Sequence, residues 1–214
     1  MKITAIAHVA VVLTIAFVSG CTVFPDHEPP RVMEIAVPGP AQVTDQRFSQ
    51  ALRVDTPYAS DPFNSSRILA KPNRWEFRAY PSVRWRDTMP VLVRDTLVGT
   101  LRSSGAFGGV ITDTSPAPAE LTLISELSAF HTENLEGETA RVVIELHAQL
   151  LENRSRTSLC KQSFRIVEPA AGSGIEQAVE AFGAAGNRLS DQIIDWVTGC
   201  GLPSRQEKDQ PRQL

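Results

Sequence analysis

The side chains whose types and spacing point most directly to chemistry are Val18, Ser19, Gly20 and Cys21. A thiol such as that of Cys21 can accept a diacylglycerol group as a thioether. The small residues before it leave the preceding peptide bond open to a signal peptidase, and the aliphatic Val18 fills a pocket of that peptidase. These four residues have the pattern of a lipobox, so we predict that Cys21 becomes the lipidated N-terminus of the mature chain.

The first twenty residues have the layout of a cleaved export signal. Met1-Lys2 gives a short positive start, and the mostly apolar run up to Val18 is too short to span a bilayer comfortably. The alternative is an ordinary export signal with a cysteine nearby by chance. We predict that residues 1–20 are removed and that three acyl chains, which a lipobox implies, anchor Cys21 to a membrane. Thr22, where an aspartate would favour the inner membrane, favours the periplasmic face of the outer membrane.

The rest of the sequence lacks the spacing of a catalytic or metal site. His131 follows a predicted strand with no cysteine, aspartate or histidine at metal-ligand spacing, and His147 falls on the polar side of another strand. The glycine-rich segment 105–109 follows a helix, whereas a phosphate cradle precedes one. Glu133 and Glu136 flank a polar loop, which is typical of solvated surface. We therefore predict a protein that is not an enzyme and holds no metal or cofactor.

Composition and charge limit the partners and the domain organisation. Removal of residues 1–20 takes away Lys2 and leaves 20 basic against 24 acidic residues, a net charge of −4. A mildly acidic chain argues against nucleic acid as a partner, because phosphate binding needs a basic face. Residues 21–45 contain five prolines, which predicts a lipidated, semi-extended tether. We expect one globular domain over residues 46–201 and a disordered polar tail over 202–214.

The spacing of apolar residues predicts the elements of the domain. Strands are expected at 48–54, 67–70, 75–82, 110–112, 120–130, 141–151 and 158–167. Apolar steps of three and four predict helices over 87–104 and 174–198. Residues 141–151 alternate between an apolar side and a mostly polar side, which indicates an antiparallel sheet covered on one face. The fold class is an α/β (α+β) sandwich, with a mixed, largely antiparallel sheet and two amphipathic helices packed on it.

Two cysteines remain once Cys21 carries the lipid. Cys160 falls on the inward side of the last predicted strand, and Cys200 continues the apolar stripe of the last helix. Export places both in an oxidising compartment, so we predict a Cys160–Cys200 disulfide that joins the helix to the sheet; two buried free thiols are the alternative. The bond would close a loop of 40 residues. In the chain-entropy model, such a loop contributes roughly 3–4 kcal/mol.

The order of these features resembles the ABC-type transport auxiliary lipoprotein family, which includes the paraquat-inducible-operon lipoprotein type. The resemblance covers residues 46–200. It rests on Ala51-Leu52-Arg53-Val54, on Arg67-Ile68-Leu69, on Tyr80-Pro81-Ser82-Val83-Arg84-Trp85 and on a helix ending at Ser103-Ser104-Gly105-Ala106-Phe107. The segment Arg86-Asp87-Thr88 departs from the shorter segment of the family, which puts in doubt a functional use of its side chains.

The resemblance implies a non-enzymatic role in an ABC-type system that moves lipids between the inner and outer membranes. Such a lipoprotein is expected to dock the mammalian-cell-entry-type periplasmic substrate-binding component. Tyr80 and Trp85 are the predicted docking residues, because aromatic side chains are enriched at interface anchors; the alternative for Trp85 is core packing. A stand-alone lipid- or glycan-binding envelope lipoprotein and a structural lipoprotein of an outer-membrane assembly remain open, as does a homo-oligomer.

Overall fold

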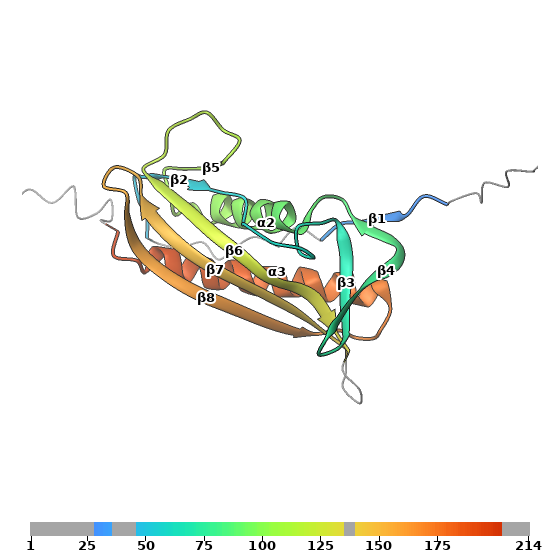
Figure 1. Cartoon of the computed structure of the whole chain (residues 1–214). Coiled ribbons are helices and arrows are strands. Elements are labelled where there is room, and N and C mark those ends of the chain that lie inside the picture. The colour runs from blue at the N-terminus through green and yellow to red at the C-terminus, as the bar shows by residue number, and fades with distance from the viewer. Residues whose placement is uncertain (1–27, 36–45, 135–139, 203–214) are drawn as a thin grey trace, which may run out of the picture.

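The computed structural model describes residues 28–35, 46–134 and 140–202. This part of the chain folds into one mixed sheet with two helices (Figure 1). The elements are β1 (Arg31–Met33), β2 (Ala51–Val54), β3 (Arg67–Asn73), β4 (Glu76–Trp85), α2 (Met89–Ser104), β5 (Gly109–Thr112), β6 (Leu121–Glu133), β7 (Arg141–Glu152), β8 (Thr157–Pro169) and α3 (Ile175–Thr198). The lipobox, the predicted signal and all but the first residue of the predicted tail lie outside the described residues.

The sheet is built around β6. On one side β6 pairs antiparallel with β7, which pairs antiparallel with β8. On its other side β6 pairs in parallel first with β2 and then with β3, and a bridge from Tyr58 to Glu126 lies between these two pairings. β5 extends the sheet from β2 in parallel, and β4 pairs antiparallel with β3 and parallel with β1. The predicted mixed sandwich is confirmed, and its longest pairings are antiparallel.

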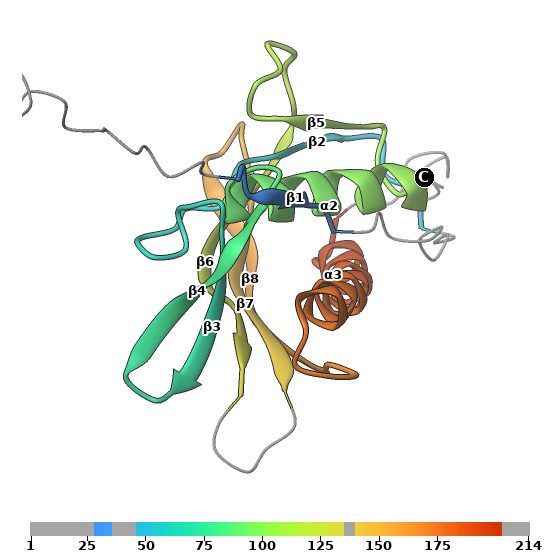
Figure 2. The same ribbon diagram turned by 90° about the vertical axis from the view of Figure 1, so that its right-hand side faces the viewer.

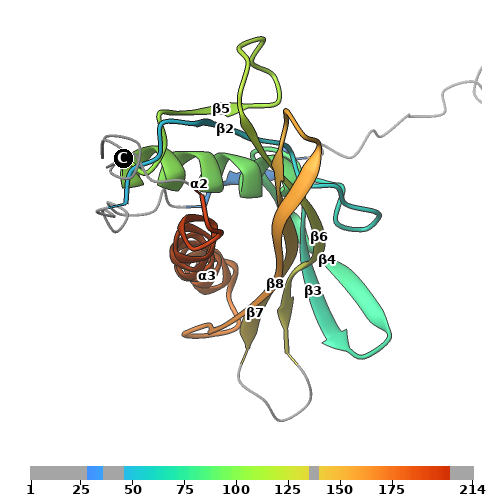
Figure 3. The ribbon, with the colours of Figure 1, turned by 90° about the vertical axis from the view of Figure 1, so that its left-hand side faces the viewer.

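Both helices lie on one side of the long strands. Edge-on views show α3 beside β7 and β8, with α2 crossing above α3 and β2 and β5 beyond it (Figure 2, Figure 3). α2 begins with Pro90 in its first turn, where no helical hydrogen bond is lost. It ends at Gly105, whose φ of 65° is left-handed and suits glycine. No helix in the described ranges is long and apolar enough to cross a membrane.

The sequence does not predict β1. Residues 31–33 fall inside the predicted tether, and three residues are too few to show a two-residue period. The structure nevertheless pairs them with Val83–Trp85 of β4. Ion pairs hold the same segment: Arg31 Nη2 lies 2.8 Å from Glu176 Oε1 on α3, and Glu34 Oε1 lies 3.1 Å from Arg86 Nε before α2. The ordered fold therefore begins before residue 46.

Candidate functional site

Trp85, one of the two predicted docking residues, is a core residue. Its exposed fraction is 0%, and its ring packs edge-on against Phe130 and Phe182, with centroids 6.0 and 5.2 Å apart. A side chain without exposed surface does not touch a partner on the folded domain. The docking prediction for Trp85 is therefore wrong, and the alternative of core packing is correct. The physical reason is the course of β4. Most of the strand lies in an exposed hairpin, and only its last residue, Trp85, is fully buried.

Tyr80, the other predicted docking residue, is half-buried. Its ring packs against the core, and its hydroxyl lies 3.0 Å from Thr132 Oγ1 on β6. The hydroxyl is thus already used inside the domain. A docking role for Tyr80 stays a prediction, and less of its surface is available for that role than its place in the sequence indicates.

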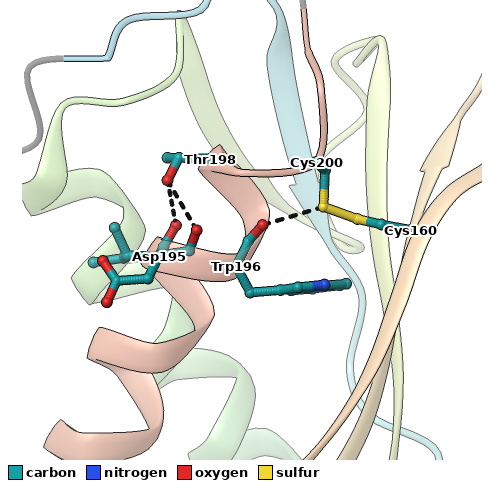
Figure 4. The surroundings of a disulfide bond; sticks show 6 residues. Cys160, Asp195, Trp196, Thr198 and Cys200 are labelled. Carbon is teal, nitrogen blue, oxygen red and sulfur yellow. Dashed lines mark hydrogen bonds between the residues drawn. A yellow bond between two sulfur atoms is a disulfide. The ribbon is translucent and has the colours of Figure 1, made fainter.

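Cys160 and Cys200 are joined by the predicted disulfide (Figure 4). Their Cα atoms lie 5.8 Å apart, which connects β8 to the residues just after α3. Trp196 on the last turn of α3 packs edge-on against Phe164 of β8, with centroids 5.6 Å apart. The bond and this ring contact fasten the same end of the helix to the same strand. The cysteine pair is therefore part of the framework and not of a reactive site.

The face of the long strands turned away from α3 is hollowed into a groove of about 810 Å³. Figure 1 looks onto this face, with α3 behind the strands. We call it the outer groove. It is lined by residues 55, 56 and 58 of the β2–β3 connection, 124–126 of β6, 147–149 of β7 and 161–163 of β8. No two of these segments are adjacent in the sequence, so the groove forms only because the strands pair.

The period of the strands explains why most side chains that line the outer groove are of polar types. On β7 the inward residues Val142, Ile144 and Leu146 are buried, whereas His147 is exposed. The wet face predicted for 141–151 is therefore present. Main-chain hydrogen bonds fix one wall, because Tyr58 N donates to Ser125 O and Leu127 N donates to Tyr58 O, both at 2.8 Å. The Tyr58 ring itself is 67% exposed on this wall.

His147 lies in the groove between two serines. Its Nδ1 is 2.7 Å from Ser163 Oγ, and its Nε2 is 3.3 Å from Ser128 Oγ. A serine–histidine pair becomes a nucleophilic centre when an acid orients the ring and backbone donors stabilise the oxyanion. Among the described residues both ring nitrogens face serines, and no hydrogen bond joins this ring to a carboxylate. The arrangement suits binding better than nucleophilic catalysis.

Asp55, which lines the groove, and Asp113, which accepts a hydrogen bond from Thr56 N, differ in their surroundings. Burial, and then the charge of the nearby Asp113, raises the pKa of Asp55. Burial also opposes ionisation of Asp113, but hydrogen bonds from Thr56 and the charge of Arg94 outweigh it and lower the pKa of Asp113. Asp55 Oδ1 is buried without a hydrogen-bond partner in the described part of the molecule. That oxygen has almost no accessible surface, so it offers no contact to a partner on the folded domain.

The other histidine considered from sequence, His131, is buried on the same sheet face, near the end of β6. It lies between Phe63 and Phe77, with ring centroids 6.0 and 5.1 Å away. Burial lowers the pKa of His131, and the contact with Glu133 opposes the shift only in part. Glu133 accepts from Arg141 at 2.9 Å, while Glu136 lies outside the described residues. Within 28–35, 46–134 and 140–202, no three His, Cys, Asp or Glu residues are grouped as a metal site.

Comparisons with known proteins agree with the fold. A family model described as the ABC-type transport auxiliary lipoprotein component matches residues 34–194. No curated protein matches the chain. Protein XCC0632 from Xanthomonas campestris, of family-model DUF330, has a similar structure: the TM-score is 0.68 and the identity 20%, over 85% of this chain and 98% of that one. A structure described only as an uncharacterized protein has a TM-score of 0.63 and 16% identity, over 79% and 99% of the two chains. At these identities the two structures show a shared fold.

Proposed function

Because this chain belongs to the ABC-type transport auxiliary lipoprotein component family, we propose that it docks the periplasmic substrate-binding protein of an ABC-type lipid transport system. That partner would be of the mammalian-cell-entry type. Acyl chains on Cys21 would hold the domain at the periplasmic face of the outer membrane and raise the local concentration of a partner that reaches across. The observation that carries this proposal is the outer groove, on the sheet face that α2 and α3 leave free.

The chemistry of the groove favours a protein partner. Tyr58 presents an exposed aromatic ring on a fixed backbone, and such residues often anchor interfaces. Glu126 and Lys161 supply one charge of each sign, and Gln149 supplies an amide donor and acceptor. An aromatic anchor inside a mixed polar rim is the usual anatomy of a non-obligate interface. The partner we expect therefore covers Tyr58 and offers complementary hydrogen bonds around it.

Site-directed photo-crosslinking in the native envelope tests the proposal. A photoreactive amino acid replaces Lys161, an exposed residue of the outer groove that pairs with Gln149, or Glu180, an exposed residue of α3 on the other side of the sheet. We expect a crosslink from position 161 to the periplasmic substrate-binding component, identified by mass spectrometry, and none from position 180. Crosslinks to that component from position 180 alone would overturn the assignment of the docking face.

A second candidate function, glycan binding, is supported by an observation of its own. An exposed tyrosine ring beside amides and hydroxyls is also a surface on which a sugar can stack, so a glycan-binding lipoprotein remains the second candidate. Native mass spectrometry with envelope glycans, and the presence or absence of adjacent permease, ATPase and single-span binding-protein genes, separate the two. A stand-alone lipid carrier is less well supported, because the apolar cavity between α2 and α3 measures about 10 Å³. That is room for about one water.

A further inference from the structure

The end of the β3–β4 hairpin carries an unusual group of side chains. Trp75, in the turn between the strands, is 91% exposed, and Phe77 beside it is 38% exposed. The other two tryptophans of the chain differ, because Trp85 is fully buried and Trp196 packs against Phe164. An exposed tryptophan leaves one of the largest apolar side chains in water, which is unfavourable unless a partner covers it.

The charges next to Trp75 along the hairpin are mostly positive, although Glu133 of β6 pairs in register with Lys71. From residue 71 to residue 78 the chain carries Lys71, Arg74 and Arg78 against the one acid Glu76. Glu76 is engaged by Arg78, with Nε and Oε1 2.6 Å apart, so it does not offset the other cations. Lys71 Nζ lies 5.4 Å from the centre of the Phe77 ring. We call residues 71–78 the hairpin tip.

The hairpin tip has a defined shape and projects from the domain. Trp75 N donates to Asn73 Oδ1 at 2.9 Å, and Asn73 Nδ2 donates to Glu76 Oε2 at 3.2 Å, which fixes the turn. Two edge-on views show β3 and β4 extending away from the long strands on the side opposite α3 (Figure 2, Figure 3). The ring of Trp75 is thus presented at an outer point of the molecule on an ordered backbone.

We propose that the hairpin tip is a second membrane contact, in which Trp75 enters the interfacial layer of an anionic phospholipid bilayer and Lys71 and Arg74 lie at its headgroups. Tryptophan favours the boundary between apolar chains and water, because its ring is apolar and its N–H is polar. Lysine and arginine beside it are attracted to anionic lipid. A protein partner would also use an aromatic residue, but the excess of positive charge favours a lipid surface.

The position of β1 makes this contact reachable from the anchor. β1 pairs with the last residues of β4, the strand that also leads to the hairpin tip. Arg31 lies ten positions after Cys21. Ten peptide units span at most about 35 Å, whereas the distance along the hairpin from Trp75 to Val83 is about 26 Å. A bilayer that holds the lipid of Cys21 is therefore within reach of Trp75.

The test uses the lipidated chain in vesicles of phosphatidylglycerol and phosphatidylethanolamine with brominated acyl chains, which quench tryptophan at short range. We expect quenching of the wild-type protein and loss of that quenching in Trp75→Phe, since Trp85 and Trp196 lie within the domain. Arg74→Glu should weaken the quenching. The matched control Arg154→Glu, an exposed residue at the β7–β8 turn, should not.

The proposed membrane contact rests on the lipid anchor of the proposed function, but the anchor and the contact are tested by different measurements. Co-flotation with vesicles reports the anchor, and quenching of Trp75 reports the hairpin tip. Chain that is not anchored gives a second measurement, in which Trp75→Ala should weaken binding to added anionic vesicles by about ten- to hundredfold. Flotation without quenching, or equal quenching in wild type and Trp75→Phe, would overturn the membrane contact and leave the tip to a protein partner.

Discussion

Trp85 at the end of β4 and Phe182 in α3 meet edge to face, with their ring centroids 5.2 Å apart and an interplanar angle of 90°. Phe130 of β6 stacks on Phe182 with a centroid separation of 4.7 Å, so three elements meet at one aromatic cluster. Both Trp85 and Phe182 have an exposed fraction of 0%. This cluster fixes α3 on the inner face of the sheet and leaves the outer face free.

Replacement of Trp85 tests whether it belongs to the core. Trp85→Ala should lower the free energy of unfolding by about 3–5 kcal/mol, because it removes a large buried ring and leaves a cavity. Urea denaturation followed by circular dichroism measures the loss. Trp75→Ala is the matched control and should change stability little, since that ring is exposed. A loss below about 1 kcal/mol for Trp85→Ala would contradict the core assignment.

The disulfide should contribute to stability by restraining the unfolded chain. The double variant Cys160→Ser/Cys200→Ser should lose about 2–4 kcal/mol relative to the oxidised wild type, measured by denaturation. Intact mass with and without reductant reports the bond itself. An unchanged mass on reduction would show that the thiols are free, and equal stability of the oxidised and reduced wild type would show that the bond does not restrain the fold.

Burial of His131 predicts a pH dependence of stability. Burial lowers the pKa of His131 in the folded state, so the unfolded chain binds the proton more tightly. The free energy of unfolding should therefore fall as the pH drops below about 6.5, the value for an unperturbed histidine. Denaturation between about pH 7 and 5 should show a smaller fall in His131→Gln than in the wild type. His147→Gln, at an exposed position, is the control, and identical slopes in wild type and His131→Gln would contradict this explanation.

Tyr80 can be tested for its two possible roles. Tyr80→Phe removes the hydroxyl that lies 3.0 Å from Thr132 Oγ1. We expect a loss of about 0.5–1.5 kcal/mol in the free energy of unfolding, matched by Thr132→Val, with a double-mutant cycle that shows coupling between the two. Affinity for the transport partner should stay unchanged. A weaker affinity with unchanged stability would instead support the docking role predicted from the sequence.

The sequence predicts the long elements well because their patterns are strong. Residues 141–151 alternate cleanly, and the structure has β7 at Arg141–Glu152. The apolar stripe of 174–198 likewise corresponds to α3 at Ile175–Thr198. The disulfide could be predicted for the same reason, because Cys160 occupies an inward position of β8 and Cys200 continues the apolar stripe of α3 just beyond its end.

What the sequence does not predict depends on contacts between distant segments. β1 is three residues long and becomes a strand only because Val83–Trp85 is available to pair with it. The outer groove joins four segments that meet only because β6 pairs with its neighbours and β7 pairs with β8. Asp55 and Asp113 come close because β2 pairs with β5. The error at Trp85 has the same origin, because periodicity alone does not show where β4 leaves the surface.

The central claim, docking through the outer groove, is tested most directly by the Kd between the full chain and the periplasmic substrate-binding component. Tyr58→Ala removes the exposed ring, and Ser163→Arg places a bulky cation in the groove. Thr157→Arg puts the same cation on an exposed position of β8 outside the groove. We predict that each groove variant weakens binding by about tenfold or more and that Thr157→Arg does not. Equal affinity for the wild type and both groove variants, or no binding by the wild type, would contradict the account.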